Sequence, residues 1–280
     1  MQVSQYVKAR RFRALHERDG AFIIPNPWDV GSARVLARLG FEALATTSAG
    51  YAFSTGQRDR AIARDAMLAH VAAIASASDL PVSADLEDGY AADLAGIEET
   101  FLQVASAGAV GASIEDASHD PHQPLLDAQL AAERVRAAAE AVHALPFPFT
   151  LTARAENFLV GRTDLKDTIA RLQMYQDAGA DVLYAPGLVD SNDIATVVRA
   201  VDRPVNVVMG LGRSRLSRWS LAALGVKRVS VGSALFRAAF GAFIRAAREM
   251  REDGTFGFAN EAIGYSEISM MFDADNEVVS

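Results

Sequence analysis

Residues 81–90 read PVSADLEDGY, a short run of apolar and small residues that passes directly into three acids and a glycine. The run from Leu80 to Asp85 has the length and composition of a buried strand, so the acids fall at its carboxyl end. Asp85 and Glu87 are two residues apart, and on an extended backbone their side chains point the same way. At about 4 Å and an effective dielectric of about 20, two such charges repel by roughly 4 kcal/mol. A divalent cation between them would remove this repulsion.

The unit of strand followed by helix repeats on both sides of this stretch. Strands are predicted at 21–25, 41–47, 80–85, 109–115, 149–154, 180–185, 204–209 and 226–231. Helices are predicted at 30–39, 61–78, 94–107, 127–144, 165–178, 190–201, 214–224 and 233–250, with a longer loop at 51–59. Three helix-to-strand junctions place a glycine where a helix C-cap needs a left-handed residue, namely Gly108, Gly179 and Gly225.

Eight such units with short connections predict a (β/α)₈ TIM barrel, with a doubly wound open sheet as the alternative. No linker rich in proline, glycine or serine divides the chain. We therefore expect one domain, with the barrel at about 20–250 and a C-terminal helical segment at about 251–280. The segment is rich in large apolar side chains, from Phe256 to Phe272, so it either caps the barrel or packs on another subunit.

Composition limits the class of protein. The 280 residues are half hydrophobic, carry a net charge of −8 and include no cysteine. The absence of cysteine excludes disulfides, thiolate metal sites and a cysteine base. An acidic chain without a basic tract is not expected to bind nucleic acid. There is no apolar run near 18 residues and no signal sequence at the N-terminus, so we expect a cytoplasmic enzyme that does not enter a membrane.

Chemistry in a barrel of this type is located at the carboxyl ends of the strands. Oxygen ligands there suit Mg²⁺ or Mn²⁺ rather than zinc. Arg154 is the natural partner of a substrate carboxylate, because its planar fork matches two oxygens. Ser48, Ala49 and Gly50 are small enough for their backbone N–H groups to approach an anion. Asn206 either reaches a ligand or satisfies backbone groups.

These residues predict a pocket for a small 2-oxo acid chelated to Mg²⁺. Such chelation stabilises an enolate, which makes it feasible to break or form a bond next to the carbonyl. The non-enzymatic alternative is a barrel that only binds a 2-oxo acid.

The chain resembles the isocitrate lyase/phosphoenolpyruvate mutase superfamily. The motifs that carry the resemblance are Ser48-Ala49-Gly50, Asp59 after Gly56, Asp85-Leu86-Glu87 with Gly89-Tyr90, Ser113-Ile114-Glu115-Asp116, and Thr152-Ala153-Arg154. The resemblance implies direct Mg²⁺ binding by Asp85 and water-mediated contacts from Asp59, Glu87 and Glu115. It also places Arg154 and the Ser48–Gly50 backbone on the substrate. It further implies a homotetramer, a dimer of dimers, whose C-terminal helices are swapped between subunits.

The chain departs from well-known members of the superfamily in the loop after the fourth strand. Isocitrate and 2-methylisocitrate lyases carry a Lys-Lys-Cys-Gly-His motif there, and the mutases carry a lysine and an asparagine. This chain has Ser118-His119-Asp120-Pro121-His122-Gln123-Pro124, and no lysine lies between Arg58 and Arg154. We therefore predict the oxaloacetate decarboxylase-like or substituted-malate lyase branch, a Mg²⁺-dependent lyase with Arg154 and Asp59 as catalytic residues. The alternative is a phosphonopyruvate hydrolase or mutase, and the proton donor stays open among Tyr51, Tyr90, Tyr184 and His119.

Overall fold

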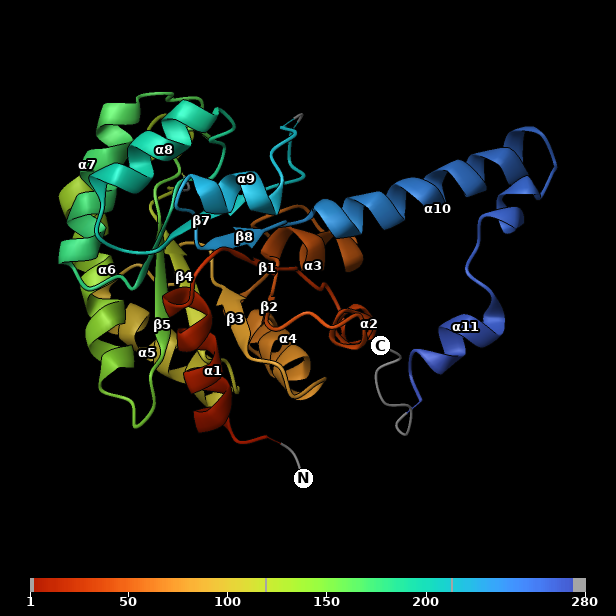
Figure 1. The fold of residues 1–280 in the computed structure, drawn as a ribbon, viewed down its shortest axis with the longest axis horizontal. Coiled ribbons are helices and arrows are strands. Elements are labelled where there is room, and N and C mark those ends of the chain that lie inside the picture. The colour runs from red at the N-terminus through yellow and green to blue at the C-terminus, as the bar shows by residue number, and fades with distance from the viewer. Residues whose placement is uncertain (1–2, 119, 213, 274–280) are drawn as a thin grey trace.

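The computed structural model describes residues 3–118, 120–212 and 214–273. Their centre is a sheet of parallel strands surrounded by helices (Figure 1). The strands are β1 (Phe22–Ile24), β2 (Leu44–Ala45), β3 (Val82–Asp85), β4 (Gly111–Glu115), β5 (Thr150–Arg154), β6 (Val182–Tyr184), β7 (Val205–Val208) and β8 (Arg228–Ser230).

The barrel helices follow the strands in the predicted order. They are α2 (Val30–Arg38), α3 (Ser48–Ser54), α4 (Arg64–Ser76), α5 (Leu94–Ser106), α6 (Ala128–His143), α7 (Leu165–Asp177), α8 (Ser191–Ala200), α9 (Arg218–Ala223) and α10 (Ala234–Glu252). The chain starts with α1 (Gln5–Glu17) and ends, within the described residues, with η1 (Gly257–Asn260) and α11 (Tyr265–Met270).

The strand order confirms the barrel. It runs β1-β8-β7-β6-β5-β4-β3-β2, so the first strand pairs with the last, which a doubly wound open sheet does not do. The two ends of the order are joined by a backbone hydrogen bond from Ala45 N to Pro25 O, at 3.1 Å. Asn26 strengthens the closure, because its Nδ2 donates to Thr46 O and its Oδ1 accepts from the N–H groups of Val231 and Gly232.

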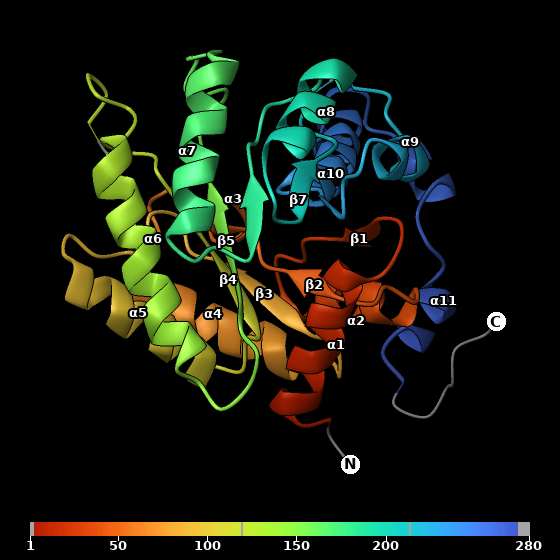
Figure 2. The ribbon, with the colours of Figure 1, turned by 60° about the vertical axis from the view of Figure 1, so that its left-hand side comes forward.

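Helix α1 packs against the amino-terminal ends of the strands (Figure 2). Its Phe12 and His16 rings meet Phe22 of β1 edge-on, with centroid separations of 6.4 and 5.0 Å. Gly111 at the start of β4 makes room for this contact, since a Cβ there would lie 2.8 Å from Phe12 Cε1. The helix therefore plugs the end of the barrel opposite the predicted site.

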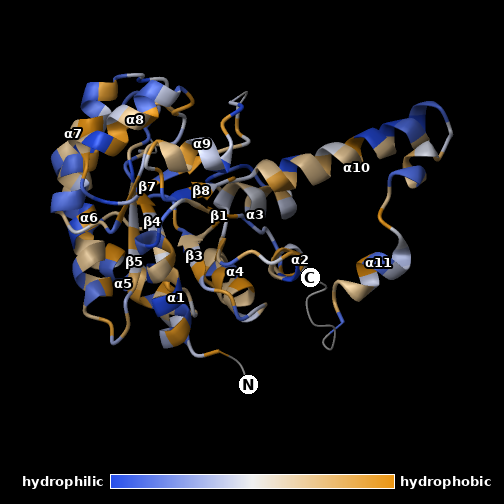
Figure 3. Cartoon of the chain, in the orientation of Figure 1, coloured by the Kyte–Doolittle hydropathy of each residue, from blue (hydrophilic) through white to orange (hydrophobic). Residues whose placement is uncertain are grey.

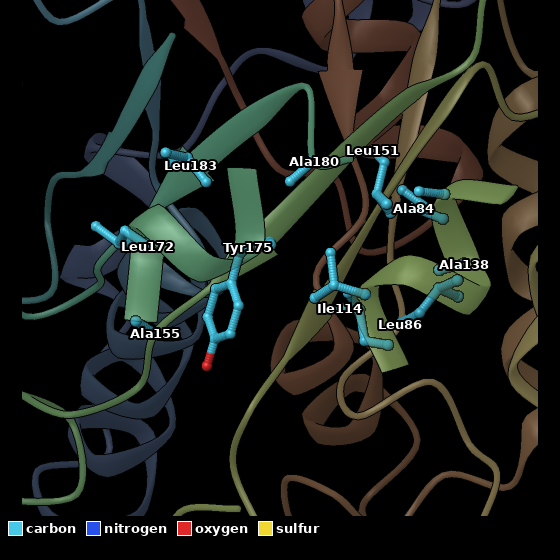
Figure 4. Packing of buried hydrophobic residues seen from close by; sticks show 14 of the residues in the cluster. Ala84, Leu86, Ile114, Ala138, Leu151, Ala155, Leu172, Tyr175, Ala180 and Leu183 are labelled. Carbon is cyan, nitrogen blue, oxygen red and sulfur yellow. The ribbon is translucent and has the colours of Figure 1, made fainter. Parts of the chain in front are cut away.

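The main core lies between the strands and the outer helices, and Figure 4 shows part of it. Helix α6 presents mostly alanines to this core, which lets the helix approach the sheet closely. Leu172 and Tyr175 of α7 fill the neighbouring part. The three predicted C-cap glycines are confirmed in the left-handed region, at φ values of 97° (Gly108), 108° (Gly179) and 92° (Gly225).

The prediction of a loop that begins at Tyr51 is wrong for its first residues. Ser48 to Ser54 form the helix α3, and Thr47 caps it by accepting a hydrogen bond from Gly50 N at 3.1 Å. A helix of seven residues is too short to show a hydrophobic period, so the cap decides its start.

The C-terminal segment forms an arm that leaves the barrel. Helix α10 points away from the strands, and the chain returns through η1 and α11 towards α2 (Figure 1). Arg38 Nη1 of α2 donates to Asp273 O at 3.0 Å. Apolar residues recur along α10 (Figure 3). Residues 274–280 of the predicted segment lie outside the described residues, and no helix in the described ranges is long and apolar enough to cross a membrane.

Candidate functional site

Asp85 is fixed at the end of β3 by groups from β2 and α3. Its Oδ2 accepts hydrogen bonds from Ser48 N at 3.0 Å and from Ser48 Oγ at 2.9 Å. Its own backbone N–H donates to Thr46 Oγ1 at 2.8 Å. The carboxylate is thus oriented by donors on one side, while Oδ1 lies 3.0 Å from Arg154 Nη1.

Arg154, at the end of β5, is surrounded by three carboxylates. Besides Asp85, its Nη2 lies 3.1 Å from Glu115 Oε2 and its Nε lies 2.8 Å from Glu156 Oε1. The ring of Tyr184 covers the guanidinium at 5.2 Å. Each nitrogen of the fork therefore has a protein partner, and the predicted contact to a substrate carboxylate stays a prediction.

Glu87 has unusual backbone and side-chain surroundings. Its φ is 50° and that of Tyr90 is 55°, a left-handed conformation that residues other than glycine adopt at a cost of about 1–3 kcal/mol. The side chain is buried beside that of Tyr90, and its Oε1 has no hydrogen bond of good geometry among the described residues. Burial, and after it the negative charge of Asp85, raise the pKa of Glu87 to about 7. A cation beside this buried carboxylate would stabilise its ionised form.

Asp59 and Glu115 lie on the same side of the barrel mouth. Burial and the charge of Asp85 raise the pKa of Asp59. Burial also raises the pKa of Glu115, although Arg154 opposes this effect. Arg60 follows Asp59 at a φ of 64°, and its Nη2 lies 3.4 Å from Glu115 Oε1.

These four acids fit a hydrated Mg²⁺. The charge of Asp85 acts on Asp59, Glu87 and Glu115, which places all of them around one region. Within the described ranges, no three carboxylate or imidazole groups converge closely enough to ligate one ion directly. Mg²⁺ usually takes one or two carboxylates and keeps several waters, so one direct ligand with further acids around its waters suits this ion. The metal roles of Asp85, Glu87 and Glu115 stay predictions.

The predicted substrate residues divide into two groups. Ser48 lies beside Asp85, but its N–H and that of Gly50 already donate to protein atoms, and Ala49 follows in the first turn of α3. Asn206 lies inside the barrel, where it accepts from Arg228 Nε and donates to Ser230 Oγ. It lines a cavity of about 60 Å³ together with Asp85 and Arg154.

The candidate proton donors are scattered. Tyr51 stacks on His70 at a centroid distance of 3.9 Å, and Tyr90 buries a hydroxyl that has no hydrogen-bond partner in the described part of the chain. Tyr184 is the one among them that lines the 60 Å³ cavity, and His119 lies outside the described residues.

Sequence reasoning missed two arginines. Arg60 connects Glu115 with the loop after β4, since its Nη1 donates to Ser118 O at 3.0 Å. Arg228 is buried in the barrel interior. Its signal in the sequence is a charged residue among the valines of the strand predicted at 226–231, although Lys227 beside it carries the same charge.

Comparison with known proteins gives a consistent result. The family model described as phosphoenolpyruvate phosphomutase matches residues 12–251. A solved structure from Burkholderia cenocepacia J2315, a proposed lyase or mutase, is 61% identical with a TM-score of 0.95, over 97% of this chain and 98% of that one. An uncharacterised protein of Mycobacterium tuberculosis (strain CDC 1551 / Oshkosh) is 35% identical, over 86% of this chain and 89% of its own length. An oxaloacetate decarboxylase of Pseudomonas savastanoi pv. phaseolicola is 28% identical, over 87% and 84%.

Proposed function

Because the chain belongs to the phosphoenolpyruvate mutase/isocitrate lyase superfamily, we propose that it is a Mg²⁺-dependent lyase. Its substrate is a small 2-oxo or 2-hydroxy dicarboxylate in which it cleaves a carbon–carbon bond. The observation that carries the proposal is Asp85, held by Ser48 at the mouth of the barrel and surrounded by three further acids and Arg154. The similarity to an oxaloacetate decarboxylase supports the reaction type.

The acids provide the metal site. Members of the superfamily depend on Mg²⁺, and in this chain Asp85 would bind the ion directly. Asp59, Glu87 and Glu115 would hold its waters. When bound, Mg²⁺ polarises the 2-oxo acid as a Lewis acid and stabilises the negative charge that develops when the neighbouring bond breaks.

Arg154 and Ser48 organise the substrate side of the site. Arg154 is a permanent cation at the carboxyl end of β5. It therefore favours an anionic substrate and stabilises the negative charge that develops on that substrate during the reaction. Arg154 Nη1, which pairs with Asp85 in this structure, would be available for a substrate carboxylate once Asp85 holds the ion. Ser48 keeps Asp85 in one orientation, because two donors bind the same oxygen. Asp59 would hold a metal-bound water beside the substrate, because its carboxylate lies within the electrostatic reach of Asp85 and Arg154.

A second candidate is carbon–phosphorus chemistry on phosphonopyruvate. The matching family model, described as phosphoenolpyruvate phosphomutase, favours it. Against it stands the loop after β4, because the chain has no lysine between Arg58 and Arg154 to meet a phosphonate.

A direct assay separates these functions. Purified protein is stripped with EDTA and then given Mg²⁺ and, in parallel, oxaloacetate, substituted malates or phosphonopyruvate. We expect pyruvate or another 2-oxo acid to be released from a dicarboxylate only when Mg²⁺ is present. Phosphate release from phosphonopyruvate alone would favour the second candidate. Binding of these acids without any turnover would favour a binding protein and contradict the lyase.

A further inference from the structure

The cavity inside the barrel mouth is rich in hydrogen-bond donors. Hydroxyl groups line it on several strands, namely those of Thr46, Ser83, Ser113, Tyr184 and Ser230. Asp85 is the one carboxylate in its lining, and two arginines, Arg154 and Arg228, complete it. Its volume is about 60 Å³, well above the roughly 10–15 Å³ that a cavity needs to hold one water. A group of the size of a carboxylate fits this space.

Arg228 brings a positive charge into this cavity from β8. Its Nε donates to Asn206 Oδ1 at 2.9 Å and its Nη2 donates to Thr152 Oγ1 at 3.0 Å. Its Nη1 lies 3.5 Å from His16 Nε2. A guanidinium has five N–H donors, so these three contacts leave two of them for another acceptor.

All three partners of Arg228 are neutral. Burial, and after it the charge of Arg228, lower the pKa of His16 to about 3, so the imidazole carries no charge at neutral pH. Burial lowers the pKa of Arg228 itself to about 10, which still leaves it a cation. No carboxylate of the described residues forms an ion pair with it, whereas Arg154 has three. A buried cation without an anionic partner is costly. An anion that enters the cavity is therefore attracted to a positive charge that no protein carboxylate neutralises.

Arg228 also reaches the inner face of the barrel that carries Arg154. Thr152, its partner on β5, precedes Arg154 by two residues, so the side chains of Thr152 and Arg154 lie on the same inner face.

We propose that this cavity is a subsite for the second carboxylate of the substrate, recognised by Arg228 and the surrounding hydroxyls. The first carboxylate, with the neighbouring oxygen, lies at the metal site by Asp85 and Arg154. The subsite selects dicarboxylates against monocarboxylates of the same shape. This inference rests on the proposed function, because it takes the metal site as the place of the 2-oxo or 2-hydroxy acid group.

Three probes separate the two parts of the site. Oxalate tests the metal site alone, while malate and 2-hydroxybutyrate share a 2-hydroxy acid group and differ in a carboxylate against a methyl group. Binding of each is measured by calorimetry with Mg²⁺ present. We expect the wild-type protein to bind malate about tenfold or more tightly than 2-hydroxybutyrate, as for a hydrogen bond to a charged group. In Arg228→Met this ratio falls to near one, while oxalate binding is kept.

Controls keep the result interpretable. Arg199→Met, which changes an exposed arginine on α8, should leave all three affinities unchanged. If circular dichroism shows that Arg228→Met does not fold, Arg228→Lys and Ser230→Ala take its place, and each should lower the ratio severalfold. Two results would overturn the subsite. One is a wild-type protein that binds oxalate but shows no preference for malate over 2-hydroxybutyrate. The other is an Arg228→Met protein that keeps this preference. Loss of oxalate binding in folded Arg228→Met also overturns the subsite. Wild-type protein that does not bind oxalate with Mg²⁺ overturns the proposed function, and the subsite with it.

Discussion

At the scale of single residues, the site consists of acids whose pKa values are raised first by burial and then by neighbouring charges, among them that of Asp85. Asp85 is held by two donors of Ser48 and faces Arg154. Glu87 has the clearest consequence, because its buried carboxylate has a raised pKa although the Tyr90 side chain lies beside it. A cation bound next to it would stabilise the ionised form.

The raised pKa of Glu87 predicts a pH effect on stability. Its pKa is about 7 in the folded protein against 4.5 as the ordinary value, so the folded state keeps a proton that the unfolded state has lost. Without Mg²⁺, the free energy of unfolding should fall as pH rises from about 4.5 to about 7, and Glu87 alone contributes roughly 3 kcal/mol at most. Urea unfolding at pH 5 and pH 7.5 measures it.

Two comparisons test the assignment to Glu87. Glu87→Gln should reduce the fall by the share of Glu87 and leave the share of Asp59 and Glu115, while Glu98→Gln, an exposed residue, should keep the whole fall. Mg²⁺ should reduce the fall in the wild-type protein, because it binds the ionised acids. A Glu87→Gln protein with an unchanged pH dependence would show that another group titrates.

Sequence reasoning identified the site residues that lie at the carboxyl ends of strands, because the predicted strand fixes their position. Asp85, Glu115 and Arg154 are at strand ends, where side-chain type and spacing suffice to predict that they meet. Arg228 could not be assigned a role in this way. Its contacts come from α1, β5 and β7, and His16 is 212 residues away in sequence. The position of the Arg60 side chain depends on a left-handed backbone conformation, which an arginine in the sequence does not indicate.

At the scale of elements, the plug formed by α1 carries a prediction. Phe12 is fully buried between Phe22, Val110 and Gly111. Phe12→Ala should lower the free energy of unfolding by about 3–5 kcal/mol, because it leaves a cavity beneath the barrel. Tyr6→Ala, on the exposed side of α1, should cost much less. Equal losses measured by urea unfolding would show that α1 does not act as a plug.

The elements themselves were largely predictable. Every strand was expected within three residues of its observed ends, because short apolar runs bounded by glycine, proline or acids are unambiguous in a repeating pattern. Helix α3 was missed because Thr47, a single capping residue, decides it. The closure of the sheet follows from the number of units, and the pairing of β1 with β8 confirms it.

At the scale of the whole molecule, the C-terminal arm is the part that a single chain leaves exposed. Phe243 is 61% exposed, Phe256 67% and Tyr265 86%. Apolar groups gathered in this way mark an interface. We propose that the arm packs on other copies of the chain in a homotetramer, a dimer of dimers, with its helices exchanged between subunits.

This assembly predicts the effect of a charge on α10. Phe243→Glu should shift the sedimenting species from tetramer to dimer or monomer, since a carboxylate would be buried in the interface. Arg248→Glu, at another exposed position of α10, serves as the control. A wild-type protein that sediments as a monomer would contradict the assembly.

The central claim is that Asp85 binds the Mg²⁺ on which the substrate acid is chelated. Calorimetry of oxalate binding, with Mg²⁺ and with EDTA, tests it most directly in three proteins: wild type, Asp85→Asn and Asp88→Asn. We expect wild type and Asp88→Asn to bind oxalate only with Mg²⁺, and Asp85→Asn to lose about 100-fold or more in affinity. Oxalate binding by Asp85→Asn as tight as wild type, or wild-type binding that is equal in EDTA, would contradict the claim.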